Sequence, residues 1–282
     1  MPSTTPAADL DLDLDAHKAA IRARIWAKLS TVALPDSRFD RDFSSFIADF
    51  RGSSSATHRL VSSLPEWRAA ALVFVAPDNC LEELRARALQ DGKTLLVTAY
   101  GIRRGFWVVR PEDVGERGAW YAATLDGVEK VGRAVGLGEV RGWAAREGRG
   151  VDVAVTGTGA VMGETGVRFG KGHGFFDLEW AMLYSVGAVA ERTLAVAVVH
   201  DCQVVGREDG LGELRPDVFD TVCDVVVTPT RVLRVEGAVK PKVGILWERL
   251  AAGMEESIPP LRELREMQRR EGLESTVGLR GG

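Results

Sequence analysis

The sequence predicts an α/β fold in which helices cover both faces of a mostly parallel central sheet. Apolar segments of strand length alternate with segments of helical periodicity along most of the chain. The strand segments are apolar at consecutive positions, which is typical of strands buried on both faces. With 282 residues, of which 45% are hydrophobic, the chain can bury such a core as one large domain or as two small ones.

The first half of the chain predicts a helix followed by a β-α-β unit. Apolar residues at helical spacing indicate a helix within residues 16–29. Continuous apolar runs predict buried strands at residues 70–76 and 93–98, and residues 81–90 between them predict a helix. Two strands joined through a helix in this way are expected to lie parallel.

The second half repeats this alternation without a detectable sequence repeat. A helix is expected at residues 178–189, between the first two strands of this half. After the break at Pro259 and Pro260, residues 261–270 predict a charged helix that packs on the domain or on a partner. Strands are predicted at three apolar segments: 151–156, 193–199 and 222–227.

The two ends of the chain differ in composition from its middle. Residues 1–15 contain alternating Asp and Leu among small polar residues, which predicts a flexible acidic leader. Residues 16–255 are expected to form the α/β domain, and residues 256–282 a C-terminal charged helix and a tail. A mobile segment is also expected at Gly52–Ser55, which is rich in serine.

Composition restricts the setting in which the protein works. The formal net charge of −4 gives no basic footprint for nucleic acid or for an anionic membrane surface. No apolar run reaches the length of a membrane span, and the first residues lack the pattern of a signal peptide. The three cysteines, Cys80, Cys202 and Cys223, are widely separated, which is typical of buried thiols in a reducing compartment. We therefore expect a cytoplasmic protein.

A glycine-rich segment carries the strongest chemical signal in the sequence. Gly170, Gly172 and Gly174 alternate with Lys171 and His173 and lead directly into a helical pattern. Glycine amides can turn towards a ligand, and the N-terminus of a helix attracts anions. The spacing matches neither the dinucleotide fingerprint nor the Walker loop. The segment therefore predicts a phosphate site, and its alternative is a simple turn before a helix.

Three separated segments resemble one known family, the 5-formyltetrahydrofolate cyclo-ligases, also called methenyltetrahydrofolate synthetases. The sequence Arg-Phe-Gly-Lys-Gly-His-Gly-Phe-Phe-Asp at 168–177 is similar to that family's loop Arg-Leu-Gly-[Arg/Lys]-Gly-x-Gly-Tyr-Tyr-Asp. Lys18 and Arg22 are similar to a Lys and an Arg four residues apart on its first helix. Residues 219–224 resemble its His-Asp-x-x-Val-Asp segment without the histidine.

Other details resemble a divergent branch of this family, the methenyltetrahydrofolate synthetase domain-containing proteins. These details are the extended loop that continues to Trp180 and two further segments, Val199–Gln203 and Val226–Thr230. The resemblance covers most of the chain and implies a Rossmann-like three-layer sandwich of the cyclo-ligase type.

The resemblance also implies a reaction. In this family ATP phosphorylates the formyl oxygen of 5-formyltetrahydrofolate, and a neighbouring nitrogen then expels phosphate to give 5,10-methenyltetrahydrofolate. By matching, Arg168 and Lys171 would serve in catalysis, and Asp177 and Asp220 would hold Mg²⁺. The residues expected to bind ATP are Lys18, Arg22, Gly170, Lys171, Gly172, His173 and Gly174.

Each of these residues also has a structural interpretation. Lys18 and Arg22 share one helix face, which would ordinarily be a solvated surface. Asp177 could favour the first turn of its helix, and Asp220 and Asp224 could cap a turn. His200 and Gln203, at the end of a predicted strand, would either order the site or satisfy backbone groups.

Two departures from the family pattern leave the substrate open. Phe175 and Phe176 replace two tyrosines and so remove two hydroxyl groups. No segment matches the family's pteridine-contacting stretch, and Arg103, Arg104 and Arg110 lie in that region instead. Three hypotheses follow: the folate cyclo-ligase, an ATP-dependent enzyme that activates a different carbonyl or carboxylate, and a non-catalytic protein that binds nucleotide or folate. The expected partner is a small molecule such as a reduced folate, bound to a monomer or homodimer.

Overall fold

The computed structural model describes residues 19–36, 42–99, 101–148, 150–170, 174–206 and 216–272. Several positions predicted from the sequence lie outside these ranges: the acidic leader, the extreme C-terminal tail, Lys18, Lys171, Gly172 and His173. Each of them stays a prediction.

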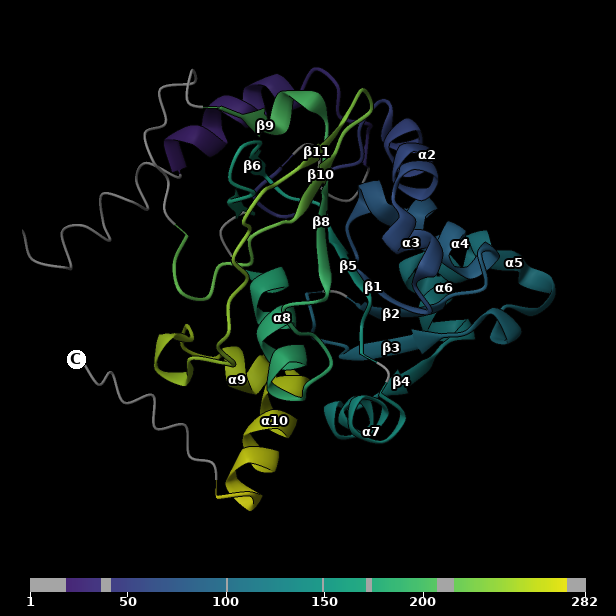
Figure 1. Ribbon diagram of the computed structural model, residues 1–282, viewed down its shortest axis with the longest axis vertical. Coiled ribbons are helices and arrows are strands. Elements are labelled where there is room, and N and C mark those ends of the chain that lie inside the picture. Colours follow the sequence, from purple (N-terminus) through teal and green to yellow (C-terminus); the bar gives the residue numbers. More distant parts are fainter. Residues whose placement is uncertain are drawn as a thin grey trace, which may run out of the picture.

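A central sheet confirms the predicted α/β fold (Figure 1). Within the described residues it has eight strands in the order β11-β10-β8-β5-β1-β2-β3-β4, and the run from β10 to β2 is parallel. Antiparallel strands flank this run on both sides, so the sheet is mixed but mostly parallel as predicted. The strands are β1 Leu72–Val75, β2 Thr94–Thr98, β3 Phe106–Val109, β4 Arg133–Val135, β5 Val153–Thr156, β8 Leu194–Val198, β10 Val225–Val227 and β11 Val232–Arg234.

The parallel strands lie where the continuous apolar runs predict them. Every residue of β1, β5 and β10 is buried, because helices cover both faces of the sheet. At the centre of the sheet, Val73 of β1 pairs with Leu95 of β2 on one side and with Val153 of β5 on the other.

Helices form the outer layers of the sandwich (Figure 1). The helix α4 follows β1, packs on β1 and β2, and contacts α2 and α5. The helix α8 lies in the connection from β5 to β8 and contacts α7. This connection crosses the sheet in the direction opposite to that from β1 to β2, so two right-handed connections place α8 and α4 on opposite faces of the sheet. These helices are α2 Ser53–Ser63, α3 Pro65–Ala69, α4 Glu82–Gln90, α5 Gly118–Ala123, α6 Leu125–Val131, α7 Leu137–Glu147 and α8 Phe175–Ser185.

The expectation of a mobile segment at Gly52–Ser55 is wrong, because α2 begins at Ser53. Gly52 precedes the helix with a φ of 94°, a conformation that glycine adopts readily. Ala56 and Leu60 are fully buried four residues apart, and this apolar stripe holds the serine-rich first turn in the helix.

The helix expected at residues 178–189 starts and ends earlier than predicted. It begins at Phe175, directly after Gly174, whose φ of 61° is left-handed, and ends at Ser185 before Gly187, whose φ is 74°. Its first turn contributes to the core, since the Phe176 ring lies 6.1 Å from the ring of Phe74 in β1. Burying a ring of this size stabilises the fold by about 2 kcal/mol.

A second, three-stranded sheet joins the N-terminal helix to the glycine loop. Residues 19–29 are helical, and Ile21 and Ile25 pack in one apolar cluster with Met162, Phe169 and other buried residues of this sheet. Figure 1 shows the helix beside β6 and β9. The strands of this sheet, in the order β7-β6-β9, are β6 Ala160–Met162, β7 Arg168–Phe169 and β9 Val204–Val205.

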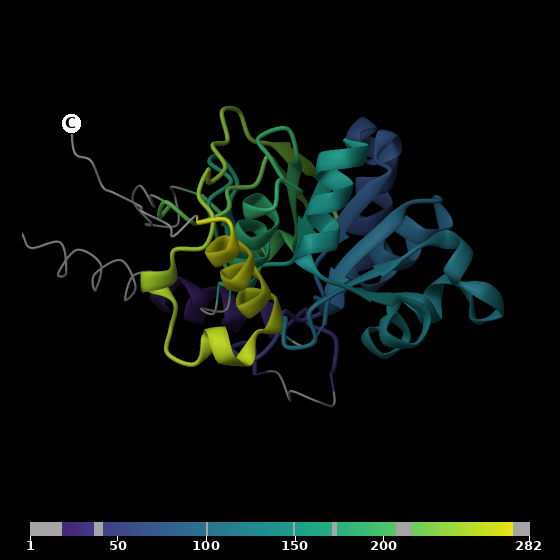
Figure 2. The same ribbon diagram turned by 90° about the horizontal axis from the view of Figure 1, so that it is seen from below.

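The C-terminal helix α10, Pro259–Arg270, packs on the domain rather than extending away from it (Figure 2). It contacts α7, α8 and the short helix α9, Met254–Ser257, and its Leu261 and Leu264 are buried in the main core. The boundary expected at residue 256 therefore separates segments that share one core.

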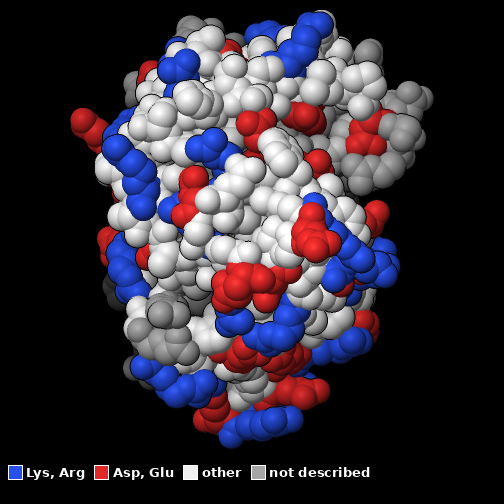
Figure 3. Space-filling model, turned by 90° about the vertical axis from the view of Figure 1, so that its right-hand side faces the viewer, with Lys and Arg blue, Asp and Glu red and all other residues white. Residues whose placement is uncertain are grey.

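The surface carries charges of both signs. On the face shown in Figure 3, basic and acidic side chains lie next to one another. In the described part of the chain, no helix combines the length and the apolar character needed to cross a membrane.

Candidate active site

A cavity of about 500 Å³ lies beyond the carboxyl ends of β1, β2 and β5. The chain passes from β1 to β2 in one direction along the sheet and from β5 to β8 in the other, so the strand order reverses between β1 and β5. Open α/β sheets bind ligands in the crevice at such a reversal. The position of the cavity therefore makes it the candidate active site.

The wall of the cavity combines an apolar surface with charged groups of both signs. The apolar side chains in the wall are Phe46, Ile47, Ala76, Pro77, Leu125, Phe175 and Phe176. The charged side chains in the wall are Arg103, Arg168, Asp78, Asp177 and Glu179. Such a wall suits a ligand with an aromatic part and an anionic part.

The described part of the glycine loop borders this cavity. Gly170 and Gly174 are both in the wall, and Gly174 directly precedes the N-terminus of α8. A Cβ atom added at Gly170 would meet nothing within 4 Å, so the space beside this backbone is open. At Gly159, by contrast, a Cβ would lie 3.0 Å from the carbonyl oxygen of Phe169, because two loops meet closely there. Open space, glycine backbone and a helix N-terminus together provide room for an anion.

Arg168 and Asp177 form a buried ion pair in the wall. A guanidinium Nη2 of Arg168 donates to Asp177 Oδ1, and the same guanidinium lies 4.6 Å from the centroid of the Phe176 ring. Asp177 Oδ1 also accepts a hydrogen bond of 2.8 Å from the Thr221 backbone N–H. Burial raises the pKa of Asp177 above its ordinary value, and the charge of Arg168 and the Thr221 N–H oppose this increase.

The two other candidate carboxylates differ in their surroundings. Asp220 lies next to Thr221, and its charge contributes to the raised pKa of Asp177, although Asp220 itself is not in the cavity wall. Asp224 accepts hydrogen bonds from Lys240 Nζ at 2.8 Å to each oxygen and from the Ala195 N–H at 2.7 Å. Asp224 therefore links distant segments of the fold, and none of these contacts is the turn cap expected from the sequence.

The N-terminal helix reaches the neighbourhood of the glycine loop from far along the chain. Ile21 and Ile25 pack in a cluster with Phe169, the residue that precedes Gly170. Arg22 lies on this helix and is half-buried, but it does not line the cavity. Its expected contact with a nucleotide stays a prediction.

The sequence did not identify Glu179 as a site residue. Glu179 is only 2% exposed, and its Oε1 accepts a hydrogen bond from the Thr98 hydroxyl at the end of β2. Burial raises the pKa of Glu179 to about 8, the charges of Asp78 and Asp177 add to this, and the Thr98 hydrogen bond and Arg168 oppose it. A signal was present, because Glu179 is the one charged residue between Asp177 and the end of an otherwise apolar helix.

Two further charged residues lie in the wall: Asp78, which the sequence analysis did not identify, and Arg103, which it named as a cation in the region of the pteridine-contacting stretch. Asp78 follows β1, and its Oδ2 accepts a hydrogen bond of 2.8 Å from the Gly157 N–H after β5. Arg103 is exposed and follows Ile102, which is completely buried with a φ of 67°. A β-branched residue in this region is strained by about 1 kcal/mol or more, so burial of Ile102 must hold the loop in place.

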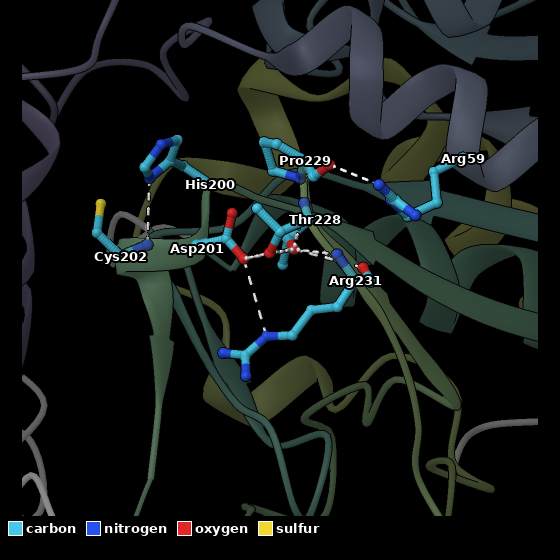
Figure 4. Close-up of polar contacts among 8 residues, drawn as sticks. Arg59, His200, Asp201, Cys202, Thr228, Pro229 and Arg231 are labelled. Carbon is cyan, nitrogen blue, oxygen red and sulfur yellow. Dashed lines mark hydrogen bonds and ion pairs between the residues drawn. The ribbon is translucent and has the colours of Figure 1, made fainter.

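The segments Val199–Gln203 and Val226–Thr230 meet at the ends of β8 and β10 (Figure 4). Asp201 Oδ1 accepts hydrogen bonds from the hydroxyl groups of Thr228 at 2.6 Å and Thr230 at 2.5 Å. His200 Nδ1 accepts from the Cys202 N–H at 3.1 Å, and Gln203 Nε2 donates to the Thr158 carbonyl at 2.6 Å. His200 and Gln203 thus satisfy backbone groups, which was one of the two roles expected for them.

Comparison with known proteins connects this site to a family. The model of the 5-formyltetrahydrofolate cyclo-ligase family matches residues 14–208, more than half of the chain. The chain belongs to this family. The match includes the described glycine loop residues, Arg168 and Asp177, and the strands β1, β2 and β5 that end at the cavity.

Relatives within the cyclo-ligase family cover nearly the whole chain. The methenyltetrahydrofolate synthase domain-containing protein of Homo sapiens is 36% identical over 263 residues, which are 92% of this chain and 64% of that protein. The protein of the same name from Danio rerio is 31% identical over 261 residues, with 92% and 64% covered. The chain therefore spans about two thirds of the length of these relatives.

A solved structure shows a more distant likeness. The NMR structure of Aquifex aeolicus 5,10-methenyltetrahydrofolate synthetase is 20% identical, covers 83% of this chain and 99% of its own, and aligns with a TM-score of 0.46. The assignment to the cyclo-ligase family rests on the sequence matches.

Proposed function

We propose that this protein uses ATP to cyclise 5-formyltetrahydrofolate to 5,10-methenyltetrahydrofolate through a phosphorylated formyl intermediate. The observation that carries the proposal is the cavity at the strand-order reversal, where the glycine loop, the N-terminus of α8 and Arg168 meet. Membership of the cyclo-ligase family supports the choice of reaction.

The chemistry requires positive groups around phosphate oxygens. An amide-like formyl oxygen leaves poorly and a phosphate leaves well, so the protein must bind ATP with its terminal phosphate beside the formyl oxygen. The Nε of Arg168 is buried and has no hydrogen-bond partner among the described residues. A buried donor without a partner is costly, and a phosphate oxygen would satisfy it. Lys171, His173, Lys18 and Arg22 would add positive charge, as the sequence predicts.

The described residues fit Mg²⁺ bound together with nucleotide better than they fit a site made of protein ligands alone. Both hydrogen bonds that Asp177 accepts from described residues go to Oδ1, which leaves Oδ2 for a metal. Within the described ranges, no three His, Cys, Asp or Glu side chains cluster as metal ligands. Mg²⁺ is commonly held by one or two carboxylates plus phosphates and water, and it would neutralise charge on the phosphates. Asp177, with Asp220 nearby, would hold it.

The apolar part of the wall supports a folate as the second substrate. A cavity of about 500 Å³ is within the range of small-molecule sites. Phe46 and Phe175 offer aromatic surface for a flat heterocycle beside the phosphate region.

The test combines an assay with a matched pair of glycine variants. The protein is mixed with ATP, Mg²⁺ and 5-formyltetrahydrofolate, and methenyl absorbance is followed together with phosphate release. Gly170→Ala adds a methyl group in open space, so it should leave stability unchanged but raise the KM for ATP at least about tenfold if phosphates approach that backbone. Gly138→Ala, in α7 and outside the cavity wall, should leave the KM for ATP unchanged. Lys171→Ala should abolish turnover.

The possible outcomes separate the three hypotheses. An absence of methenyl product, under conditions in which a known cyclo-ligase is active, would reject the proposal. Phosphate release with another carbonyl or carboxylate compound would favour a different ATP-dependent enzyme. Binding of nucleotide or folate without turnover would favour a non-catalytic binding protein.

A further inference from the structure

A second cavity, of about 410 Å³, lies at the edge of the sheet opposite the candidate active site. Its wall contains Leu72 at the start of β1, Thr94 at the start of β2 and Asp152 directly before β5. These strands are parallel, so the second cavity lies at their amino ends and the candidate active site beyond their carboxyl ends. A volume of this size is within the range of small-molecule sites.

Arg110 lines the second cavity, although the sequence analysis grouped it with Arg103 in the pteridine region. The pairing of β3 explains the difference. This strand runs antiparallel to β2, and its last residue, Val109, pairs with Leu95 near the start of β2. The chain therefore crosses from the carboxyl edge of the parallel strands at Arg103 to their amino edge at Arg110.

A second guanidinium group, that of Arg192 before β8, also lines this cavity. A Cβ atom added at Gly150 would lie 3.0 Å from Arg192 Nη2, so this guanidinium lies against the glycine backbone of the wall. Neither Arg110 nor Arg192 has a hydrogen bond or ion pair with a residue that the structure describes. Glu139, whose pKa is lowered by Arg133 and to a smaller extent by Arg110, has both carboxylate oxygens bound to Arg133. Two cationic donors are therefore left for an anionic ligand.

The rest of the wall offers an aromatic ring and a hydrogen-bond acceptor. Trp143 of α7 is half-buried and lines the cavity. Asp152 accepts hydrogen bonds from the Ala71 and Leu72 N–H groups at 2.8 and 3.0 Å, and both go to Oδ2. Its Oδ1 is left for a donor in the cavity, and carboxylates in nucleotide sites accept hydrogen bonds from ribose hydroxyl groups. The negative charge of Asp152 is offset by the buried Lys93 ammonium, on which it acts.

We infer that the second cavity binds a nucleoside monophosphate. The base stacks on Trp143, a ribose hydroxyl donates to Asp152, and the phosphate accepts charge-assisted hydrogen bonds from Arg110 and Arg192. An inorganic anion would engage the two guanidinium groups and leave the ring and the carboxylate unused. The inference is independent of the proposed function, because the walls of the two cavities share no residue.

The test compares three probes, AMP, adenosine and inorganic phosphate, by isothermal titration calorimetry on the full chain. AMP should bind at least about tenfold more tightly than adenosine or phosphate, because each of those has only one half of the complementary groups. Arg192→Gln should weaken AMP binding at least about tenfold and leave adenosine binding unchanged. Arg192 is exposed and unpaired among the described residues, so its replacement should not affect folding. Arg146→Gln, exposed on α7 and outside the wall, is the matched control and should bind AMP like the wild type.

Replacements of Trp143 test the contact with the base. Trp143→Leu should lower the affinity for AMP to near that for phosphate, whereas Trp143→Phe keeps an aromatic ring and should retain most of the affinity. Circular dichroism and Tm show whether either variant is misfolded.

The outcomes separate this site from the candidate active site. The AMP binding that depends on Arg192 should be unchanged in Gly170→Ala, which alters only the active-site wall. An absence of AMP binding, or an affinity for AMP that Arg192→Gln leaves unchanged, would overturn the inference. An affinity for AMP no greater than that for phosphate would reduce the cavity to an anion site and overturn the nucleotide assignment. The methenyl assay, by contrast, tests only the proposed function.

Discussion

Arg168 and Asp177 are nine residues apart in the sequence, and their side chains form an ion pair across the glycine loop. Arg168 belongs to β7 and Asp177 to the first turn of α8, so the pair joins the two elements that the loop connects. The ends of the loop are therefore held together in the absence of any ligand.

Replacing Asp177 should affect both stability and metal-dependent binding. Asp177→Asn leaves the buried Arg168 charge without its partner, which should destabilise the fold by about 3 kcal/mol in urea unfolding. It should also abolish the increase in Tm that Mg²⁺ adds to that produced by ATP. Glu116→Gln, at an exposed position outside the cavity wall, serves as the control. An unchanged response to Mg²⁺ in Asp177→Asn would contradict metal binding by Asp177.

Glu179 should make stability depend on pH in a way that does not require any activity. Burial raises the pKa of Glu179 in the folded state from its ordinary value of 4.5 to about 8, so the folded state binds the proton more tightly than the unfolded state. The stability that this proton contributes is lost as pH rises from about 4.5 to 8. The free energy of unfolding of Glu179→Gln minus that of the wild type should increase by roughly 4 kcal/mol over this window. Urea unfolding at pH 5 and pH 8.5 measures it. A difference that stays constant with pH would show that Glu179 is ionised throughout.

Arg85 should be essential for the shape of the cavity although it is not in the wall. Its guanidinium is buried and donates to the carbonyl oxygens of Ala123 at 2.8 Å, Ala76 at 2.7 Å and Asp78 at 3.1 Å. Arg85→Met leaves these carbonyl groups unsatisfied and should destabilise the fold by about 3 kcal/mol. In the same helix, Arg87 is 41% exposed, and its ion pair among the described residues is with Asp91. Arg87→Met should cost less than about 1 kcal/mol.

Arg103 should contribute to substrate binding and not to stability. It is exposed in the wall and makes no hydrogen bond or ion pair with the described residues, so Arg103→Gln should leave Tm unchanged. The KM for the anionic substrate that it contacts should rise about tenfold, which corresponds to the loss of one charged hydrogen bond. Arg104 follows in the same loop but pairs with Glu129 at 2.6 Å and is not in the wall. If Arg104→Gln raises KM as much as Arg103→Gln, the effect comes from the positive charge of the loop as a whole, and a direct contact between Arg103 and the substrate is contradicted.

The sequence predicted most of the sheet because burial on both faces leaves a local signal. Strands such as β1 and β5 are short apolar runs, and the structure places them within two residues of the predicted bounds. The helix α2 was missed because its first turn is made of serines, and only its packing against the core reveals it.

The part of the candidate site that the sequence indicates consists of residues from one continuous motif. Arg168, Gly170, Gly174 and Asp177 all lie in the wall of a single cavity, as a phosphate loop requires. Glu179 depends on contacts between elements that are distant in sequence, since Thr98, its hydrogen-bond donor, is 81 residues away. Such a separation leaves no pattern in one sequence, and the signal that the sequence does offer is the acidic residue in an otherwise apolar helix.

The strained backbone at Ile102 affects how much conformational entropy is lost when a ligand binds. Because burial of Ile102 fixes the loop after β2, the backbone of Arg103 is already ordered before any substrate arrives. Only the side-chain rotamers of Arg103 then remain to be restricted, a cost of about 1 kcal/mol, whereas ordering a flexible loop would cost about that much for each of its residues. Part of the entropy cost of binding the substrate is thus already met when the chain folds.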